Sequence, residues 1–521
     1  MPATTPLAMR APRMLAAAAL LFVAAAPLAA QKEPYPGFDA YVTAAMKTWD
    51  VPGLAIALVR NDSVIYLKGY GVRQLGKPDV VDPQTMFAIG SSSKAFTAAS
   101  IGMLIDEGKL KFDDPVTKYL PGFEMYDPFV TRELTVRDLL SHRSGLARGD
   151  LVWYGSELDR DEVLRRVRFL KPSWGFRAQF GYQNLMYLAA GQVVAAVSHQ
   201  TWDDFVRERI FTPLGMTSTN TSVTKLASLT DVAQPHQKID DTVLAIPYRR
   251  IDNAGPAGSI NSNVTDMAQW VRFQLAGGKF GGKQLLSTRV LDEEHMPQTI
   301  IPVSPQVKKL YPQTHFTSYG MGWFLEDYRG KEIWHHGGNI DGMTALVAML
   351  PEEHLGLVIL TNMNGTPLPS LLMHRTWDLH LKAPLTDWSA MMKKLADSTA
   401  VIAAAAQKKQ EATHVTGTKP SLALEQYAGT YSDSMYGQLK ITMQNGALYA
   451  SMGPSFEGPL EHWHYDTFRA IWKARSLGKA MITFPLNSAG KADAARVELG
   501  AMGTTEFRRA PEPRAARAGQ E

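Results

Sequence analysis

The sequence predicts an α/β (α+β) fold followed by a separate all-β segment, and three observations lead to this. Strand-like runs occur at about 53–67 and again at about 318–362. The stretch between them, from 95 to about 290, is mainly helical with long loops. Beyond residue 424, short strand-like runs follow one another without helices between them, which is typical of an antiparallel β domain.

The first part of the chain predicts a helix, a hairpin and a closing helix. Residues 36–50 have a helical pattern, and residues 53–67 read as two strands that turn at Asn61-Asp62. Asn and Asp tolerate the positive φ angles that a two-residue hairpin turn requires. A further helix is expected at 370–381, after the second group of strands. Pattern alone therefore places sheet-forming segments at both ends of this domain.

The C-terminal third divides into an arm and a small domain. Residues 383–423 are expected to form a helical arm or linker, because the chain is rich in Ala, Lys and Gln from Trp388 to about Gly417. Residues 424–510 hold a strong hairpin signal at Asn445-Gly446, with further strand-like runs on both sides. They predict a small antiparallel β domain. Residues 511–521 are expected to be a disordered tail.

The N-terminus predicts export. Arg10 and Arg13 precede an apolar run over 14–30, and a polar break follows, which is the pattern of a secretory signal peptide at 1–30. The run is short for a transmembrane span and contains Pro27. No cysteine occurs in the chain, so disulfides and lipoprotein attachment are excluded. We expect a periplasmic or secreted protein with no membrane span in its mature form.

Charge and composition exclude some partners. The 521 residues carry a formal net charge of +4, which becomes +2 when the two arginines of the predicted signal peptide are removed. Neither a nucleic acid nor an anionic membrane surface is implied by so small a charge. The expected partner is a small-molecule or peptide substrate.

The most informative motif is Ser91-Ser92-Ser93-Lys94 at the start of a predicted helix. Residues three apart on a helix share a face, so the amine of Lys94 is expected over the hydroxyl of Ser91. The partial positive charge of a helix N-terminus favours an alkoxide there and disfavours an extra proton on the lysine. Ser91 is therefore a candidate nucleophile and Lys94 a candidate base. The plainer alternatives are a helix N-cap for Ser91 and a solvated first-turn lysine for Lys94.

Two further motifs follow in chain order. Tyr182 and Asn184 lie in the stretch 181–184, and His336, Gly338 and Asn339 lie in the Gly-rich stretch 336–342 between two strand-like runs. As alternatives, Tyr182 could be a packing aromatic, Asn184 a helix cap, and the glycines a bulge at a sheet edge. The neighbouring His335 is expected to face the other side of its strand and to be structural.

The order Ser-x-x-Lys, Tyr-x-Asn and Gly-rich strand resembles the serine β-lactamase and D,D-peptidase superfamily, most closely its class C group, over residues 35–382. The resemblance implies a mixed sheet built from both chain ends, beside a helical subdomain, with the active site between them. It implies that Ser91 attacks, that Lys94 acts as base and that Tyr182 moves a proton to the leaving group. Asn184 would position Lys94 and the substrate amide. The backbone N–H groups of Ser91 and Asn339 would form the oxyanion hole, which Gly338 keeps accessible.

The third motif departs from the Lys-Thr-Gly of penicillin-binding proteins and class C β-lactamases, because this chain has His336-Gly337-Gly338. If His336 faces a substrate carboxylate, its weak charge near neutral pH predicts weaker binding of β-lactams. His-Gly-Gly resembles the esterase, D-aminopeptidase and CubicO-type branches of the superfamily.

The sequence lacks the motifs of other hydrolase classes and of common cofactor-binding proteins. The chain has no G-x-S-x-G elbow, no H-E-x-x-H and no Walker A or dinucleotide fingerprint. His462 and His464 could share a strand face, but without a nearby carboxylate they read as surface residues rather than metal ligands. No cofactor and no metal are predicted.

The C-terminal segment resembles the lipocalin-like domain that is fused to CubicO-type serine peptidases. The stretches 427–431 and 460–468 carry this resemblance. Such a barrel could hold a ligand or could have a filled core that serves in assembly or active-site shielding. A homo-oligomer formed through this domain is a further expectation.

Together these features predict an exported serine hydrolase that acts through an acyl-enzyme on amide or ester substrates. D-amino-acid-containing peptides or peptidoglycan fragments are the expected substrates. One alternative is a carboxylesterase or weak β-lactamase. An alternative of another class is a penicillin-recognising sensor or scaffold that acylates without turnover, which burst kinetics would distinguish.

Overall fold

The computed structural model describes residue 1, residues 32–500 and residues 503–511. The predicted signal peptide (after Met1) and the predicted tail (after residue 511) lie outside the described residues. Residues 33–521 belong to one compact unit. Among the described residues, no helix has the length and apolar character needed to cross a membrane.

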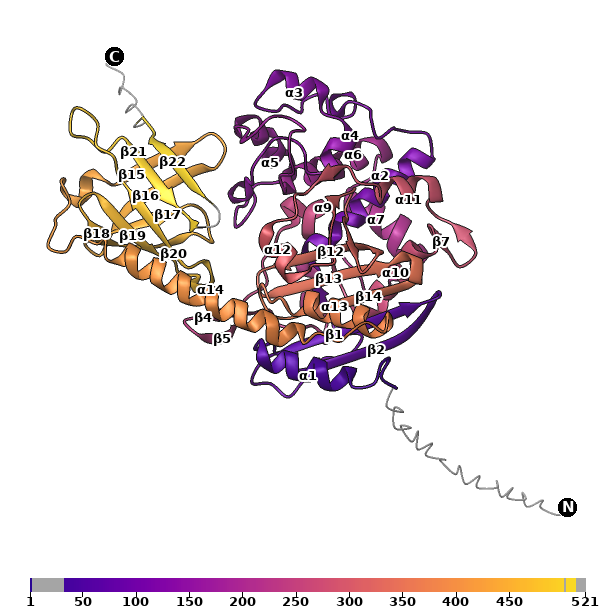
Figure 1. Cartoon of the computed structure of the whole chain (residues 1–521). Helices are drawn as coiled ribbons and strands as arrows, with labels where there is room; N and C mark the ends of the chain where they lie inside the picture. Colours follow the sequence, from indigo (N-terminus) through magenta and orange to yellow (C-terminus); the bar gives the residue numbers. More distant parts are fainter. Residues whose placement is uncertain (2–31, 501–502, 512–521) are drawn as a thin grey trace. The chain divides into compact units, whose positions relative to one another are not determined.

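An eight-stranded sheet forms the centre of the first domain (Figure 1). Its order is β2-β1-β14-β13-β12-β11-β10-β9, so the first and last strands of the domain lie side by side, as predicted. The strands are β1 (Gly53–Arg60), β2 (Ser63–Gly71), β9 (Thr299–Ile300), β10 (Thr317–Tyr319), β11 (Phe324–Tyr328), β12 (Lys331–Ile340), β13 (Met343–Leu350) and β14 (Leu355–Thr361).

The pairing within this sheet corrects one detail of the prediction. A mixed sheet was expected, but every pair of neighbouring strands is antiparallel. Strands β10 to β14 follow one another through short connections, and such connections can join only antiparallel neighbours. The β1–β2 hairpin turns at Asn61 and Asp62 as predicted, with φ of 49° and 60°.

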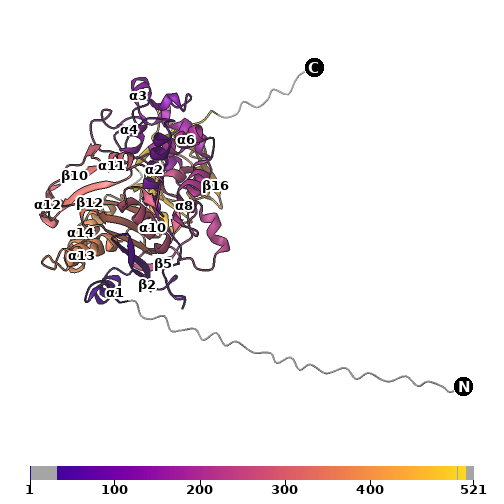
Figure 2. The ribbon, with the colours of Figure 1, turned by 90° about the vertical axis from the view of Figure 1, so that its right-hand side faces the viewer.

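Strand β1 is buried on both faces, and its alternate residues enter two different cores. Leu54, Ile56 and Leu58 pack in one core with helices α1 (Phe38–Thr48), α13 (Leu368–His380) and the start of α14 (Trp388–Glu411). Ala55, Ala57 and Val59 face the other core, beneath α10 (Val264–Leu275). Because successive side chains of a strand point to opposite faces, one strand holds the two layers together. Figure 2 shows helices on both sides of the sheet.

The helical subdomain is inserted between β2 and β9. It contains the 3-10 turn η1 (Gly90–Ser93) and the helices α2 (Lys94–Asp106), α3 (Pro128–Glu133), α4 (Val136–Leu140), α5 (Arg160–Arg166), α6 (Asn184–Ser198), α7 (Trp202–Val206), α8 (Thr212–Leu214), α9 (Gly255–Gly258) and α11 (Thr288–Glu294). Three two-stranded ribbons accompany them: β3 (Phe87–Ala88) with β6 (Asn261–Ser262), β4 (His236–Ile239) with β5 (Thr242–Ala245), and β7 (Lys279–Phe280) with β8 (Lys283–Gln284). Helix α12 (Pro305–Leu310) lies between β9 and β10.

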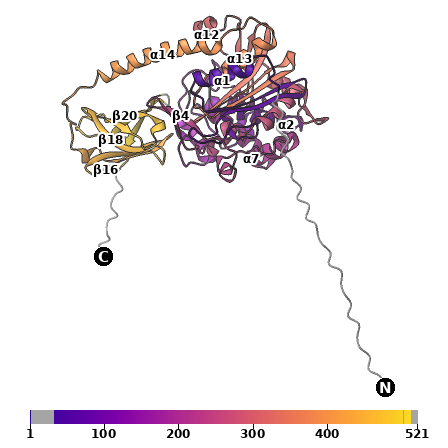
Figure 3. The same ribbon diagram turned by 90° about the horizontal axis from the view of Figure 1, so that it is seen from below.

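The last part of the chain is a closed eight-stranded antiparallel barrel. Its strands are β15 (Gly429–Asp433), β16 (Gly437–Gln444), β17 (Ala447–Ser451), β18 (Glu457–His464), β19 (Thr467–Ile471), β20 (Lys479–Thr483), β21 (Ala494–Glu498) and β22 (Thr504–Arg509). Pairing of β15 with β22 closes the ring. Figure 3 shows α14 as one long helix between α13 and this barrel.

Large side chains fill the interior of the barrel. The buried members include Tyr427, Tyr431, Phe456, Phe468, Trp472, Phe484 and Phe507. This is the arrangement expected of a packed core. His462 and His464 lie at a break in the β18 register, where the His462 ring bonds to the carbonyl of Tyr465 at 2.9 Å. No group of three metal-ligating side chains occurs among the described residues.

Candidate active site

Ser91 and Lys94 lie where η1 passes into helix α2. Neither of the plainer alternatives for them is found. The N-cap position of α2 is Ser93, which makes no side-chain cap bond, so Ser91 does not cap the helix. The side chain of Lys94 is fully buried instead of solvated. An amine without water around it must find its partners within the protein.

Lys94 has three such partners. Its Nζ lies 3.1 Å from Ser91 Oγ, 2.8 Å from Asn184 Oδ1 and 2.7 Å from the carbonyl oxygen of Ala257. The last two atoms can only accept hydrogen bonds. They therefore take two hydrogens from the amine and leave its third position directed at the hydroxyl of Ser91.

The electrostatic surroundings disfavour the protonated form of this amine. Burial is the main cause that holds the pKa of Lys94 well below its usual value, and the cation of Arg148 lowers it further, while Asp150 raises it. A neutral amine has only two hydrogens, which match the two obligatory acceptors, and its lone pair then faces Ser91. The arrangement can take the hydroxyl proton when Ser91 attacks a carbonyl carbon.

Tyr182 lies beside the same pair with the opposite protonation. Its hydroxyl interacts with Ser91, and burial raises the pKa of this phenol well above its usual value. Lys94 Nζ lies 4.8 Å from the centre of the Tyr182 ring. A phenol that keeps its proton beside an amine that has lost one gives the site a donor and an acceptor at one serine.

Asn184 is aimed at Lys94, and its neighbour supplies the helix cap. The side chain of Gln183 accepts the backbone N–H of Leu185, so the capping role considered for Asn184 belongs to Gln183. Asn184 Nδ2 donates to Asp150 Oδ1 at 2.9 Å. A carboxylate can only accept, so this bond fixes the amide with its oxygen toward Lys94.

The backbone N–H groups of Ser91 and Asn339 come together where η1 meets strand β12. A Cβ built on Gly90 would lie 2.8 Å from Asn339 N, and one built on Gly338 would lie 3.1 Å from Ser91 N. The same atom on Gly338 would lie 1.8 Å from the carbonyl oxygen of Ile89, which no side chain can tolerate. Glycine at both positions allows the two backbones to approach this closely.

His336 is not brought to the substrate side of the site. It is 1% exposed, its Nδ1 lies 2.6 Å from the carbonyl oxygen of Gly337, and its Nε2 lies 3.0 Å from the hydroxyl of Tyr319. The carbonyl must accept, so Nδ1 carries the hydrogen and Nε2 accepts from Tyr319. Burial, with a smaller contribution from Lys94, lowers the pKa of His336 to about 3. The expected contact between His336 and a substrate carboxylate therefore has no basis in this geometry.

His335 next to it packs away from the reacting groups. Its ring stacks on Phe324 with centroids 5.5 Å apart, and its Nε2 lies 3.6 Å from Glu326 Oε1. Burial lowers the pKa of His335 to about 4. These contacts agree with a structural role.

Three site residues were missed by the sequence analysis, and all lie on the loop that follows α4. Arg148 Nε donates to Asp150 Oδ2 at 2.5 Å, and Trp153 Nε1 donates to Asp150 Oδ1 at 2.9 Å. Asp150 thus connects Arg148 to Asn184 and, through Asn184, to Lys94. An acidic and a basic residue two positions apart carry no motif, so only the folded loop reveals their role.

His142 also supports the site. Its backbone has φ of 55°, a conformation that a non-glycine residue seldom adopts. Its Nδ1 accepts the backbone N–H of Gln183 at 3.1 Å, and its ring lies 4.2 Å from that of Tyr182. Burial holds the pKa of His142 well below its usual value, with smaller contributions from neighbouring cations. The neutral ring forms the wall behind Tyr182.

A cavity of about 60 Å³ opens at Ser91. Its wall is part polar and part apolar, with one arginine. The lining residues are Gly90, Ser91, Arg148, Trp153, Asn184, Ile251, Ala254, Ala257, Gly258, Asn339 and Ile340. The nucleophile, the amide of Asn184 and Asn339 of the proposed oxyanion pair thus open onto one small space, which limits the groups that fit beside Ser91.

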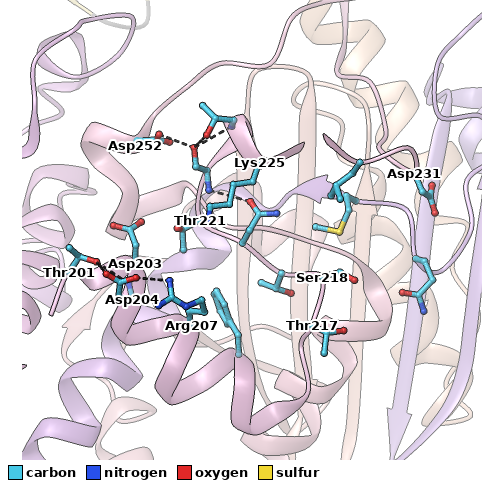
Figure 4. Close-up of a pocket in the computed structure, with 18 of the residues that line it drawn as sticks. Thr201, Asp203, Asp204, Arg207, Thr217, Ser218, Thr221, Lys225, Asp231 and Asp252 are labelled. Atoms are coloured by element: carbon cyan, nitrogen blue, oxygen red, sulfur yellow. Dashed lines mark hydrogen bonds and ion pairs between the residues drawn. The ribbon is translucent and has the colours of Figure 1, made fainter. Parts of the chain in front are cut away.

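A larger groove of about 860 Å³ lies elsewhere and has a different character (Figure 4). It is lined mainly by hydroxyl-bearing and charged side chains, and neither Ser91 nor Lys94 is among them. Several of its charges are paired, among them Asp203 with Arg160 at 2.7 Å and Asp204 with Arg207 at 2.5 Å. Size alone therefore does not identify the catalytic site, which is defined by the proton-accepting geometry at Ser91.

Comparison with known families agrees with this fold. The family model described as Beta-lactamase matches residues 38–381, and the chain belongs to that family. A second model, described as Domain of unknown function (DUF3471), matches residues 413–513. The resemblance to serine β-lactamase-related proteins is thereby confirmed.

Two curated relatives extend the comparison. The unguisins hydrolase ungD of Aspergillus violaceofuscus is 28% identical over 447 residues, covering 80% of this chain and 78% of the relative. Protein flp of Staphylococcus aureus is 26% identical over 333 residues, covering 62% of each chain. The family and its hydrolase relative make this chain a β-lactamase-fold hydrolase.

Solved structures share the architecture. The octameric penicillin-binding protein homologue from Pyrococcus abyssi superposes with a TM-score of 0.59 at 19% identity, covering 91% of this chain and 99% of the other. The D-stereospecific amidohydrolase from Streptomyces gives a TM-score of 0.53 at 24% identity, covering 64% of this chain and 97% of the other. The first of these similarities extends over most of the chain, the barrel region included.

Proposed function

We propose that this hydrolase cleaves amide or ester bonds through an acyl-enzyme on Ser91. The single observation that carries the proposal is the environment of Lys94. It is a buried amine with two obligatory acceptors, a lowered pKa and its remaining position 3.1 Å from Ser91 Oγ. The lowered pKa and this position together support a role for Lys94 as the base that accepts the proton of Ser91.

In the acylation step, Ser91 Oγ attacks the substrate carbonyl carbon and its proton passes to Lys94 Nζ. The carbonyl oxygen becomes negative and accepts hydrogen bonds from the backbone N–H groups of Ser91 and Asn339. The bond to the leaving group then breaks. Tyr182 gives its proton to the departing nitrogen or oxygen and is reprotonated from Lys94, so that no net charge accumulates.

In the deacylation step, water replaces the leaving group and the proton transfers run in reverse. Tyr182 and Lys94 together take a proton from the water as its oxygen attacks the acyl carbon. The ester bond to Ser91 breaks, and the serine oxygen recovers a proton. The acid product leaves, and the free enzyme is restored.

The proposed substrates are D-amino-acid-containing peptides or peptidoglycan fragments. The His-Gly-Gly motif, similar to that of the D-aminopeptidase and CubicO-type branches, supports this class. The relative named as an unguisins hydrolase supports hydrolysis as the reaction. A carboxylesterase is the second candidate, because the small cavity at Ser91 would also accept short acyl esters.

We also propose that the chain is exported and assembles through its C-terminal domain. The signal-peptide pattern at 1–30 supports export to the periplasm or outside the cell. The octameric state named for the Pyrococcus abyssi homologue supports an oligomer. Light scattering on the full chain and on a chain that ends at residue 412 tests this. If both chains form oligomers with the same number of subunits, assembly through the barrel is contradicted.

The test of the function is turnover with pre-steady-state resolution. Purified protein is mixed with a short-chain 4-nitrophenyl ester, a D-aminoacyl 4-nitroanilide and nitrocefin. We expect multiple turnovers with the ester or the anilide, and an initial burst of about one equivalent where deacylation is slow. A single equivalent followed by no turnover with every substrate would identify a sensor instead. Absence of any product would contradict the proposal.

A further inference from the structure

Arg148 is the one charged side chain among the described residues that line the cavity at Ser91. Its cation helps to lower the pKa of Lys94, but no step of the acylation mechanism requires it to line the cavity. Its guanidinium carbon lies 5.2 Å from the centre of the Tyr182 ring, so its cation sits beside the phenol that protonates the leaving group. A cation at this point needs a reason beyond the chemistry of the serine.

Asp150 holds this arginine by one nitrogen only. The bond runs from Arg148 Nε to Asp150 Oδ2, and the second carboxylate oxygen is occupied by Asn184 and Trp153. Within the described chain, the two terminal nitrogens of Arg148 make no hydrogen bond or ion pair. The guanidinium is thus held through Nε and lies over the Tyr182 ring, while its two terminal nitrogens remain free to donate.

The rest of the cavity wall gives no support to a substrate cation. None of the described lining residues carries a carboxylate, and Asp150 itself is engaged by three donors. A free ammonium on the leaving group would meet the cation of Arg148, which repels it. A substrate with a carboxylate would find two parallel N–H groups, the geometry in which arginine binds carboxylates most strongly.

We propose that Arg148 is a specificity residue that binds a carboxylate on the leaving-group side of the scissile bond. Tyr182 determines this side of the scissile bond, because its hydroxyl protonates the leaving group and its ring lies beside the guanidinium of Arg148. This inference rests on the proposed function and deepens it. The favoured substrates release a fragment with a free carboxylate, as the cleavage of a C-terminal residue from a peptide does, and substrates whose leaving group carries a free amine are disfavoured.

The test compares two esters that differ only in charge. The 3-carboxyphenyl and 3-carbamoylphenyl esters of N-acetyl-D-alanine have the same shape, and the ratio of their kcat/KM values measures charge recognition. Differences in intrinsic reactivity cancel because the ratio is compared between variants. We expect Arg148→Gln to lower this ratio by about tenfold or more, and Arg148→Lys to lower it less, because lysine keeps the charge without the fork. The discrimination of the wild-type enzyme should weaken at high salt.

Arg250→Gln is the matched control. Arg250 also donates through Nε to an aspartate two residues on, Asp252, at 2.9 Å, but it does not line the cavity. Its substitution should leave the ratio as in the wild type. Circular dichroism confirms that each variant is folded.

The outcomes separate the two levels of the argument. If both esters are hydrolysed and Arg148→Gln keeps the wild-type ratio, the specificity inference is wrong and the proposed function stands. If the charge effect appears instead when the carboxylate is moved to the acyl group, the assigned side is wrong. If neither ester is hydrolysed by the wild-type enzyme, the proposed function fails, and the inference fails with it.

Discussion

Removal of Arg148 or of Asp150 should move the acidic limb of the pH profile in opposite directions. Lys94 must be neutral to accept the proton of Ser91, so kcat/KM rises with pH through the pKa of Lys94 in the free enzyme. The cation of Arg148 opposes protonation of Lys94, and the anion of Asp150 favours it. Arg148→Gln should therefore shift the limb to higher pH, and Asp150→Asn should shift it to lower pH.

The size of the shift follows from the distances. Lys94 Nζ lies 4.8 Å from the centre of the Tyr182 ring, and Arg148 Cζ lies 5.2 Å from the same point. The two charges are therefore no more than about 10 Å apart. Two unit charges at that separation interact by about 1.7 kcal/mol at an effective dielectric constant of 20 and by about 0.4 kcal/mol in water. These values correspond to about 1.2 and 0.3 pH units. Arg148 is 58% exposed, so screening brings its effect toward the lower value.

Asp150 should have an effect of comparable size and opposite sign. Its side chain is 12% exposed, and a single amide, that of Asn184, separates it from Lys94. We expect a downward shift of about 1 pH unit in Asp150→Asn. Asparagine keeps an oxygen that can accept from Asn184, so this substitution removes the charge while it preserves the orientation of the amide.

The assay is kcat/KM for 4-nitrophenyl acetate between pH 5 and 10, corrected for spontaneous hydrolysis. A neutral ester keeps substrate charge out of the comparison. The double variant should have a midpoint between those of the single variants, and Arg250→Gln should have the wild-type midpoint. Shifts of the same sign in the two single variants, or no shift in either, would refute the assignment of the limb to Lys94.

Three other substitutions test separate parts of the site. Tyr182→Phe should lower kcat by about 10²- to 10⁴-fold in ester turnover, and near-native turnover would assign both proton transfers to Lys94. Gly338→Ala places a Cβ 1.8 Å from the carbonyl oxygen of Ile89 and should lower kcat by about 10²-fold or more. In the control Gly337→Ala, the nearest contact of the new Cβ would be 3.7 Å away, and kcat should fall far less. Equal losses of kcat would contradict the role of Gly338. His336→Lys should lower the Tm by several degrees, because it buries an unpaired charge, and an unchanged Tm with tighter binding of carboxylate substrates would show that this position does face the substrate.

The contact between Ser91 and Lys94 could be predicted because their spacing is a property of helices. Ser91 and Lys94 lie three apart at a helix start, and their contact follows from helix geometry whatever surrounds it. The turns were predictable for a similar reason. Asn61-Asp62 and Asn445-Gly446 adopt positive φ angles that few other residue pairs tolerate.

The remainder of the site depends on contacts between segments distant in sequence. Asp150 meets Asn184 only after α6 has packed beside the loop that follows α4, and no local pattern marks that meeting. His336 was expected at the substrate because its motif position suggested it. In the structure, the hydroxyl of Tyr319 on β10 occupies one ring nitrogen of His336, and the tyrosine helps to bury the ring. The antiparallel sheet likewise reflects the short connections between strands, which residue patterns do not reveal.

The central claim is that Ser91 is the nucleophile, and peptide mass spectrometry after labelling with a fluorophosphonate tests it most directly. We predict one adduct per chain on Ser91, much slower labelling in Lys94→Ala, and none in Ser91→Ala. Ser92→Ala removes the neighbouring hydroxyl, which bonds only to the carbonyl of His336, and should still be labelled at Ser91. An adduct on Ser92, Ser93 or Ser144, or undiminished labelling of Ser91→Ala, would contradict the account.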